Sequence, residues 1–363
     1  MAYGRCCCRW RFRTATAAAN ALRWCVETRK RGVQTGGNVA PVTKRVTIAT
    51  IAQAAGVSVP TVSRVLNGHR DISRETRERV ERLLHEYDYR PRASRQQNRT
   101  GMIDFILPDL DCPWAMQLLR GVENTARDEG LGVTVAAAST VRRRRTDGAV
   151  LVTLSGRDRV GTELRRHAVP MVSIDPSDEA AADVPTIGVT NWSGARVATE
   201  HLIGLGHRRI GMIGGPRGQL CSRARLDGYR AALEDAGLPL DAGLLDSGDF
   251  CFESGVAAGG RLLDRLDPPS AIFAASDQMA FGVYAAAWSR GLRVPTDLSV
   301  VGFDDLEAHR AAPPLTTVRQ PLVEMGRLAT RTLLGLIRGE PAGAARAELV
   351  TELIVRASTT APA

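Results

Sequence analysis

The sequence has no apolar stretch near the ~18 residues that a membrane-spanning helix needs. Its seven cysteines lie at no spacing that would form a zinc site with histidine partners. The run of small residues at 15–19 is too short and too weakly apolar for a secretory signal. We therefore expect no membrane association and no bound metal. We interpret Cys112, Cys221 and Cys251 as reduced, mostly buried thiols of a cytoplasmic protein.

Residues that would indicate an enzyme are also missing. The histidines beyond residue 102 show neither the spacing of a metal pair nor a paired nucleophile. The glycine-rich segment 211–215 lacks the spacing of a dinucleotide-binding fingerprint, so we interpret it as a tight turn. We expect no catalytic residue and no cofactor.

Lysine is nearly absent, because Lys30 and Lys44 are the only two and every other basic residue is arginine. Residues 1–41 hold 8 basic and 1 acidic residue, residues 42–101 hold 12 and 6, and residues 102–363 hold 28 and 32, which gives net charges of +7, +6 and −4. A basic front end on an acidic body predicts a polyanionic partner for the front end alone. Biased codon usage is the other explanation of the arginines, but the charge distribution favours nucleic acid.

The length of 363 residues allows a small module and one large domain. We predict a basic extension at 1–44, a DNA-binding headpiece at 45–101 and a large domain at 102–359. Residues 1–41 lack helical or strand periodicity, which predicts disorder. Our hypothesis is that this segment reflects an upstream start codon and that the working protein begins near residue 42. N-terminal sequencing of the native protein that began at Met1 would contradict this hypothesis.

Three short helices are predicted after Thr47, each with apolar residues on one face. These apolar positions are Ile48, Ile51, Ala52 and Ala55, then Val62, Val65 and Leu66, then Val80, Leu83, Leu84 and Tyr87. Thr47, Ser58 and Ser73 precede the three runs as N-cap candidates. Gly56 lies where a tight turn needs positive φ, and Pro60 lies in a first helical turn, where its missing N–H is harmless.

The first two predicted helices and the turn between them have the spacing of a helix-turn-helix, whose second helix enters the major groove of DNA. Apolar side chains at the start of this helix suit contact with thymine methyl groups. Short polar side chains there suit contact with phosphates, and an arginine one turn later can reach a guanine edge. The predicted DNA-binding residues here are Thr47, Ser58, Val59, Pro60, Thr61, Ser63, Arg64 and Asn67. The alternative is an ordinary helical hairpin whose polar residues face water.

From Gly101 onward, apolar strands alternate with amphipathic helices, which predicts parallel sheets covered on both faces. The predicted strands are Ile103–Leu107, Val133–Ala137, Ala149–Thr153, Met171–Ile174, Thr186–Val189, Ile210–Ile213, Ala271–Ala275 and Ser299–Phe303. The predicted helices are Met116–Glu129, Ser193–Leu205, Arg223–Ala236, Glu253–Leu266, Gln278–Arg290 and Leu322–Arg338. Ligands of such folds bind at the carboxyl ends of the strands.

One connection is shorter than this scheme requires. About eight residues, Ser139–Thr146, join two predicted strands, whereas a parallel crossover needs roughly a dozen or more. Either a helix is missing, or these two strands do not pair in parallel.

Several motifs resemble those of the lactose/galactose repressor family. In the headpiece they are Ile51-Ala52, Gly56-Val57-Ser58, Thr61 to Asn67 and Tyr89-Arg90-Pro91. Downstream they include Pro113-Trp114-Ala115, Leu205 to Ile210, Arg225 to Tyr229, Ser276-Asp277-Gln278, Val300 to Asp305 and Pro314 to Thr317. The resemblance implies a homodimer on a palindromic operator, a hinge helix after Pro91, and a two-lobed α/β domain like the periplasmic sugar-binding proteins.

The hinge departs from the family pattern. Members of the family usually place a leucine there as a wedge between base pairs, and Asn98 occupies the matching position. Asn98 can contact minor-groove acceptors instead, and Arg95 adds a phosphate contact. We predict weaker DNA bending and more salt-dependent binding. A bending assay that showed full kinking, abolished by Asn98→Ala, would contradict this.

Acidic residues follow four predicted strands, at the edge where a small polar ligand would bind. They are Asp109, Asp175, Asp277 and Asp304. By resemblance, Trp114 and Phe250 supply aromatic surfaces at the cleft and Arg225 binds hydroxyl groups, while Asn191 closes its rim. The alternative is that these acids cap turns and that the aromatic rings fill the core.

Together these features predict a sequence-specific repressor of carbohydrate-utilisation genes, associated with the nucleoid and controlled by a mono- or oligosaccharide bound between two lobes. No heptad repeat follows Leu353-Ile354-Val355, which favours a dimer. One alternative is a DNA-binding regulator that has lost ligand sensing, because of the short Ser139–Thr146 connection. A stand-alone sugar-binding protein is a further alternative, against which the helix-turn-helix argues.

Overall fold

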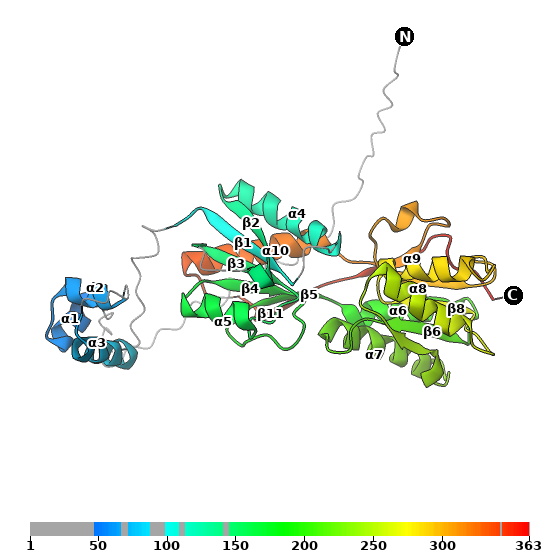
Figure 1. Ribbon diagram of the computed structural model, residues 1–363, viewed down its shortest axis with the longest axis horizontal. Coiled ribbons are helices and arrows are strands. Elements are labelled where there is room, and N and C mark those ends of the chain that lie inside the picture. Colours follow the sequence, from blue (N-terminus) through cyan, green and yellow to red (C-terminus); the bar gives the residue numbers. More distant parts are fainter. Residues whose placement is uncertain are drawn as a thin grey trace, which may run out of the picture. The chain divides into compact units, whose positions relative to one another are not determined.

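The computed structural model describes residues 47–66, 72–87, 99–108, 113–140, 145–341 and 343–362, and it divides the chain into two units, 1–92 and 93–363. The first unit contains α1 (Ile48–Ala55), α2 (Val59–Leu66) and α3 (Arg74–Glu86) (Figure 1). The three predicted helices are therefore confirmed. Their buried faces meet in one small core of Ile51, Ala52, Ala55, Val62, Val65 and Val80. Tyr87, predicted to join this core, is instead 40% exposed at the end of α3.

The helix ends in this unit follow the predicted local chemistry. Thr47, Ser58 and Ser73 each accept a hydrogen bond from the backbone N–H three residues later, which satisfies a donor that the first helical turn leaves unpaired. Gly56 ends α1 with φ of 63°, a conformation that glycine adopts without steric cost. Pro60 lies in the first turn of α2.

The second unit has two lobes, each built on a six-stranded sheet. In lobe 1 the order is β11-β5-β4-β3-β1-β2, from the strands Arg346–Leu349, Thr186–Val189, Met171–Ile174, Gly148–Val152, Met102–Leu107 and Gly132–Ala137. In lobe 2 it is β12-β10-β9-β8-β6-β7, from Glu352–Ile354, Thr316–Arg319, Ser299–Asp304, Ala271–Ala274, Ile210–Gly214 and Leu245–Ser247. Neighbouring strands are parallel except β10 and β12. The predicted doubly wound α/β fold is confirmed.

Helices cover both faces of each sheet (Figure 1). In lobe 1, α4 (Pro113–Asp128) and α10 (Leu322–Arg338) pack on one face, and the short α5 (Arg159–Arg166) packs on the other. In lobe 2, one face packs against α6 (Asn191–Gly204) and α7 (Leu220–Asp235), and the other against α8 (Phe252–Leu263) and α9 (Asp277–Trp288). The chain crosses between the lobes three times, after β5, β10 and β11.

The short connection between β2 and β3 has a specific topological explanation. These strands do not pair with each other, because each pairs in parallel with β1, one on either side of it. Apart from one 3-10 turn, Ala138–Thr140, the described part of this connection holds no helix, and residues 141–144 lie outside the described residues. The second face of the lobe 1 sheet therefore packs mainly against α5, which the sequence pattern did not predict.

Two findings bear on the predicted chemistry of the chain. Cys221 is partly buried and Cys251 is exposed, so the prediction of a buried thiol is wrong for Cys251; Cys112 lies outside the described residues. Among the described residues, no group of three His, Cys, Asp or Glu side chains is placed to hold a metal ion, and no helix is long and apolar enough to cross a membrane.

Candidate functional site

The start of α2 presents most of the predicted DNA-binding residues to solvent. Ser58, Val59, Pro60 and Arg64 are exposed, whereas Thr61 and Ser63 are partly covered. The buried positions of the same helix, Val62 and Val65, hold its other face against α1 and α3. This division of faces leaves the N-terminal turn of α2 accessible to a groove of DNA. Asn67, Arg95 and Asn98 lie outside the described residues.

Arg225 is the central residue of the second candidate site, which lies in the second unit. Arg225 as a whole residue is 4% exposed. Its guanidinium donates two hydrogen bonds, from Nε to Asn191 Oδ1 at 2.8 Å and from Nη1 to the Ala275 carbonyl at 2.6 Å. The guanidinium carbon lies 3.7 Å from the ring centre of Phe303 and 5.6 Å from that of Phe250. A buried cation held by carbonyl oxygens and aromatic faces is rigid and keeps its charge available to a ligand.

Two of the four predicted acids approach Arg225 from different lobes. Asp175 follows β4 of lobe 1, and Asp304 ends β9 of lobe 2. Burial raises the pKa of each carboxyl group to about 6, although the positive charge of Arg225 opposes the shift in both. Gln320 also opposes it at Asp304, because its Nε2 donates to Oδ1 at 2.6 Å. The geometry thus assembles two acceptors and one cation between the lobes, a set that suits a ligand with several hydroxyl groups.

Backbone conformation sets this cluster apart from the surrounding sheets. Asp175, Phe250 and Asp304 all adopt positive φ, of 42°, 71° and 126°. Such conformations are uncommon for residues other than glycine, and they tend to gather at ligand sites, where the surrounding structure holds them.

The other predicted ligand residues have different surroundings. The carboxylate of Asp277 is fully buried and accepts from the Leu306 N–H at 2.6 Å and from the Thr317 hydroxyl at 2.5 Å. Because both its oxygens accept hydrogen bonds from the protein's own chain, we leave Asp277 out of the proposed ligand set. Its contact with Leu306 instead holds the loop after β9 in place. Trp114, at the start of α4, is partly buried against the core of lobe 1. Asp109 lies outside the described residues.

Sequence reasoning missed three residues of this cluster. Phe303 lies against the guanidinium of Arg225, and it belongs to a strand whose apolar pattern indicated only burial. The Oγ of Ser222 and the Oε1 of Gln320 are buried polar atoms without a hydrogen-bond partner. Buried polar groups are nearly always paired, so these two atoms are further candidates for contact with a ligand. A serine and a glutamine carry no sequence signal of their own.

Comparison with known proteins identifies both units. Residues 47–92 match the model of bacterial regulatory proteins of the lacI family, and residues 199–359 match a periplasmic binding protein-like domain. The HTH-type transcriptional regulator DegA of Bacillus subtilis (strain 168) is 35% identical over an alignment of 333 residues that covers 87% of this chain and 98% of DegA.

Solved structures give the same result. A structure described as the transcriptional regulator CelR-cellobiose complex is 36% identical, with a TM-score of 0.67, over 86% of this chain and 100% of that one. The lac repressor dimer bound to operator and the anti-inducer ONPF is 30% identical, with a TM-score of 0.63, over 88% of this chain and 100% of that one. With a helix-turn-helix headpiece, a two-lobed α/β unit and relatives that match over nearly their whole length, this chain belongs to the lacI family of bacterial transcription regulators.

Proposed function

We propose that this regulator is a repressor of carbohydrate-utilisation genes in the bacterial cytoplasm, and that it binds a palindromic operator as a homodimer. A neutral sugar between the lobes sets its affinity for that operator. The observation that carries the sugar proposal is the Arg225 network, in which a lobe 2 guanidinium binds Asn191 at a lobe crossing and interacts with Asp175 of lobe 1. The structures of similar regulators with cellobiose or with operator support the two classes of partner.

The same network indicates how ligand and DNA binding are coupled. A sugar that contacts Asp175 on one side and Arg225 and Asp304 on the other is bound fully only when the lobes are closed. Its binding energy therefore favours the closed arrangement over the open one, and DNA affinity changes to the extent that the headpieces respond.

The DNA-binding part is tested at Arg64. Arg64→Ala is expected to cost about 1–3 kcal/mol in discrimination between the operator and a scrambled duplex, because a bidentate contact with one guanine is lost. Fluorescence anisotropy with duplexes taken from upstream of the gene measures this difference. Arg327→Ala, a surface change on α10, is the control. Equal loss of affinity for both duplexes would show that Arg64 holds a phosphate instead.

The effector part is tested at Arg225. A panel of neutral mono- and oligosaccharides is screened by thermal shift with the full chain, and every hit is tested for release or recruitment of operator DNA. Arg225→Met, which keeps an apolar side chain over Phe303, is expected to abolish the ligand-dependent shift. Retention of the shift in this variant would contradict the assigned site.

A second candidate function is a DNA-binding regulator that does not respond to ligand. The β2–β3 connection favours it, because its described part holds only the 3-10 turn Ala138–Thr140 and no longer helix to cover the sheet. It predicts operator binding that no sugar in the panel changes, while Arg64→Ala still weakens recognition.

A further inference from the structure

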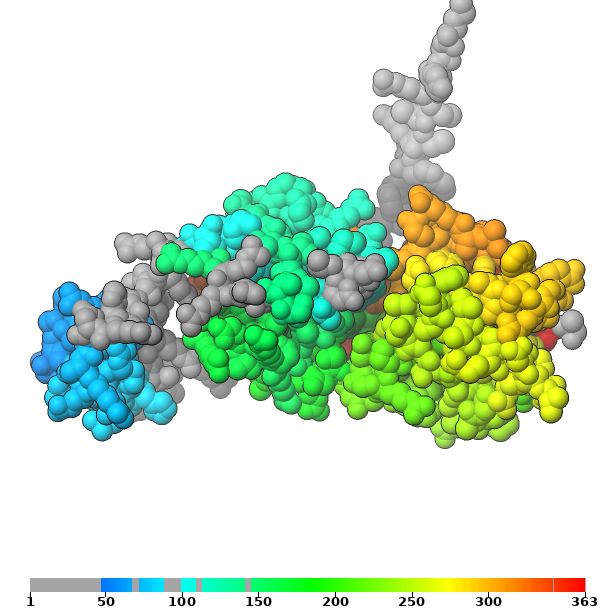
Figure 2. Space-filling model, in the orientation of Figure 1, coloured from blue at the N-terminus to red at the C-terminus, as the bar shows by residue number. Residues whose placement is uncertain are grey.

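A cavity adjoins the Arg225 cluster on the lobe 1 side. It has a volume of about 550 Å³, within the range of roughly 300–1,000 Å³ typical of small-molecule sites. Figure 2 shows a furrow between the green surface of lobe 1 and the yellow-green surface of lobe 2. The cavity shares Asp175 and Asn191 with the cluster, but its lining includes neither Arg225 nor Asp304. It is therefore space that borders the Arg225 cluster at these two shared residues.

The floor of this cavity is the polar face of two neighbouring strands, and we call it the β5–β11 groove. Thr186 pairs with Arg346 and Gly188 pairs with Glu348, so all four residues lie on one face of the sheet. The residues that alternate with them pack into the core below α10. A Cβ atom on Gly188 would lie 3.2 Å from Asp175 Oδ1, so the absence of a side chain at Gly188 lets the Asp175 carboxylate lie over the sheet.

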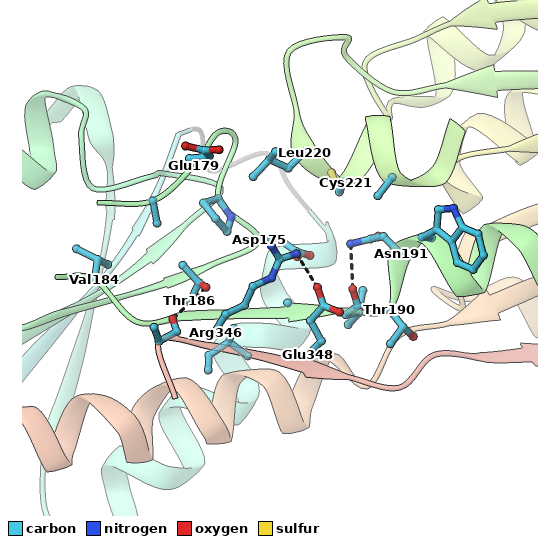
Figure 3. Close-up of a pocket in the computed structure, with 18 of the residues that line it drawn as sticks. Asp175, Glu179, Val184, Thr186, Thr190, Asn191, Leu220, Cys221, Arg346 and Glu348 are labelled. Carbon is cyan, nitrogen blue, oxygen red and sulfur yellow. Dashed lines mark hydrogen bonds and ion pairs between the residues drawn. The ribbon is translucent and has the colours of Figure 1, made fainter. Parts of the chain in front are cut away.

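Donors and acceptors converge in the groove. Arg346 Nη2 donates to Glu348 Oε1 at 2.6 Å, and Figure 3 shows Arg346 reaching from its strand toward Asp175 with Glu348 beside it. Asp175 interacts electrostatically with both Arg346 and Arg225, so it links the groove to the first site. The Arg346 and Glu348 side chains are 71% and 39% exposed, and such a pair contributes little to stability, so a ligand can reorganise it at small cost.

The charges and the shape of the groove specify its ligand. The charged residues that line the groove are three acids, Asp175, Glu179 and Glu348, and one base, Arg346. This excess of acidic residues disfavours an anionic sugar, because like charges repel. Small residues, including Ala180 to Ala182, form one wall and leave room for a ring. Trp192 lines the end of the groove toward α6 and is 40% exposed, which supplies apolar surface.

We propose that the effector is a neutral oligosaccharide, with one ring bound at Arg225 and Asp304 and the next ring bound in the β5–β11 groove by Arg346 and Glu348. This inference rests on the proposed function, because it extends the same site by one subsite. Arg346 and Glu348 determine ligand length, while Arg225 is needed for ligands of any length.

The test compares matched sugars of different length. Isothermal titration calorimetry with the full chain compares each monosaccharide with the oligosaccharides built from it. The three series are glucose, cellobiose and cellotriose; xylose and xylobiose; and galactose and β-linked galactobiose. In one series, the oligosaccharide is expected to bind at least about tenfold more tightly than its monosaccharide. Arg346→Ala and Glu348→Ala are expected to remove this advantage, because they weaken oligosaccharide binding by about tenfold and monosaccharide binding much less. Arg327→Ala, which also breaks a surface ion pair but lies on α10, should change neither.

The failures of the two proposals differ. Equal affinity for mono- and oligosaccharides, or an equal loss of both in Arg346→Ala, would overturn the second subsite while the sugar function stands. No binding of any sugar would overturn the sugar function and the subsite with it. Thermal unfolding of each variant confirms that the fold is intact.

Discussion

At the scale of the residue, the arrangement around Arg225 shows why identical side chains take different roles. Asp277 and Asp304 both stand at the carboxyl end of a lobe 2 strand. Asp277 is the first residue of α9 and turns inward, where two donors of its own chain satisfy its carboxylate. Asp304 ends β9 with φ of 126° and lies beside Arg225. Local backbone direction therefore decides which acid is satisfied by its own chain and which lies beside Arg225.

The pKa of Asp175 leads to a prediction about stability. Burial raises this pKa from its ordinary value of 3.8 to about 6 in the folded protein. Between these two values the folded state binds more protons than the unfolded state, so the free energy of unfolding falls as pH rises from about 4 to about 6. Asp175→Asn carries no such charge. Relative to the unchanged protein, it should gain about 1–3 kcal/mol of stability between pH 4 and pH 7.

Urea unfolding at several pH values between 4 and 7 measures this gain. At Asp304 an asparagine could place its own NH2 group against the Nε2 donor of Gln320. Asp175 has no such amide donor beside it among the described residues, so asparagine is a suitable replacement there. Asp178→Asn, an exposed change in the same loop, is the matched control. Stability curves for Asp175→Asn and the unchanged protein that run parallel across this range would show that Asp175 does not titrate as described.

At the scale of the element, α4 and α10 are packed more closely than side chains would allow. Gly121 of α4 and Gly326 of α10 meet at this contact. A Cβ atom at Gly121 would lie 2.0 Å from the Val323 carbonyl oxygen, and one at Gly326 would lie 2.2 Å from the Leu118 carbonyl oxygen. Neither helix can yield cheaply, because each blocking atom belongs to a backbone. The two glycines thus set the distance at which α10 covers the lobe 1 sheet.

Gly326→Ala should therefore destabilise the second unit, even though alanine favours helices. Overpacking of this kind costs about 1–3 kcal/mol or more, which exceeds the roughly 0.5–1 kcal/mol gained in helix propensity. Gly204→Ala in α6 is the matched control, since a Cβ there would meet nothing within 4 Å, and it should be neutral or slightly stabilising. Chemical denaturation followed by circular dichroism compares the two. Equal stability of both variants would refute the close contact.

The elements that the sequence predicted are apolar strands and helices with a regular apolar pattern. All eight predicted strands and all six predicted helices of the second unit are present, with ends that differ by a few residues. The strands β7, β10, β11 and β12 and the helix α5 escaped prediction, because they are short and mix polar with apolar residues. The equally short β4, β5 and β8 were predicted because their residues are mostly apolar. Their formation depends on neighbours far away in the chain.

At the scale of the whole molecule, three crossings of the chain join the two lobes. The β5 and β11 crossings are joined to each other, because Thr351 N–H donates to Thr190 Oγ1 at 3.0 Å and Thr190 N–H donates to the Leu349 carbonyl at 3.0 Å. These bonds hold the two strands as one ribbon, so we expect the lobes to move about them as rigid bodies.

We predict that a bound ligand closes the two lobes about these crossings. Saturation with a sugar that binds the Arg225 cluster should reduce the radius of gyration of the chain, measured by small-angle X-ray scattering. Asp175→Ala removes the lobe 1 contact and keeps those of lobe 2. It should weaken sugar binding by about tenfold or more and abolish the compaction at saturating sugar. Full compaction in this variant would mean that another lobe 1 residue closes the cleft.

The sequence alone determined what depends on short-range order. Helix caps, the turn at Gly56, the exposed start of α2 and the apolar strands all follow from the residues within one or two turns of each position. The motifs around Arg64 and Arg225 were sufficient to indicate the family. The predicted hinge residue Asn98 and the domain boundaries at 44 and 101 remain predictions.

Only the tertiary structure decided how the candidate ligand residues are combined. Phe303 lies under Arg225, 78 residues away in the chain. Arg346 reaches Asp175 only because the chain returns to lobe 1 before α10, so that β11 pairs with β5. Periodicity reports whether a side chain faces inward but not which distant element it meets. The groove over β5 and β11 exists because strand order brings together segments about 160 residues apart, and strand order is a property of the folded chain.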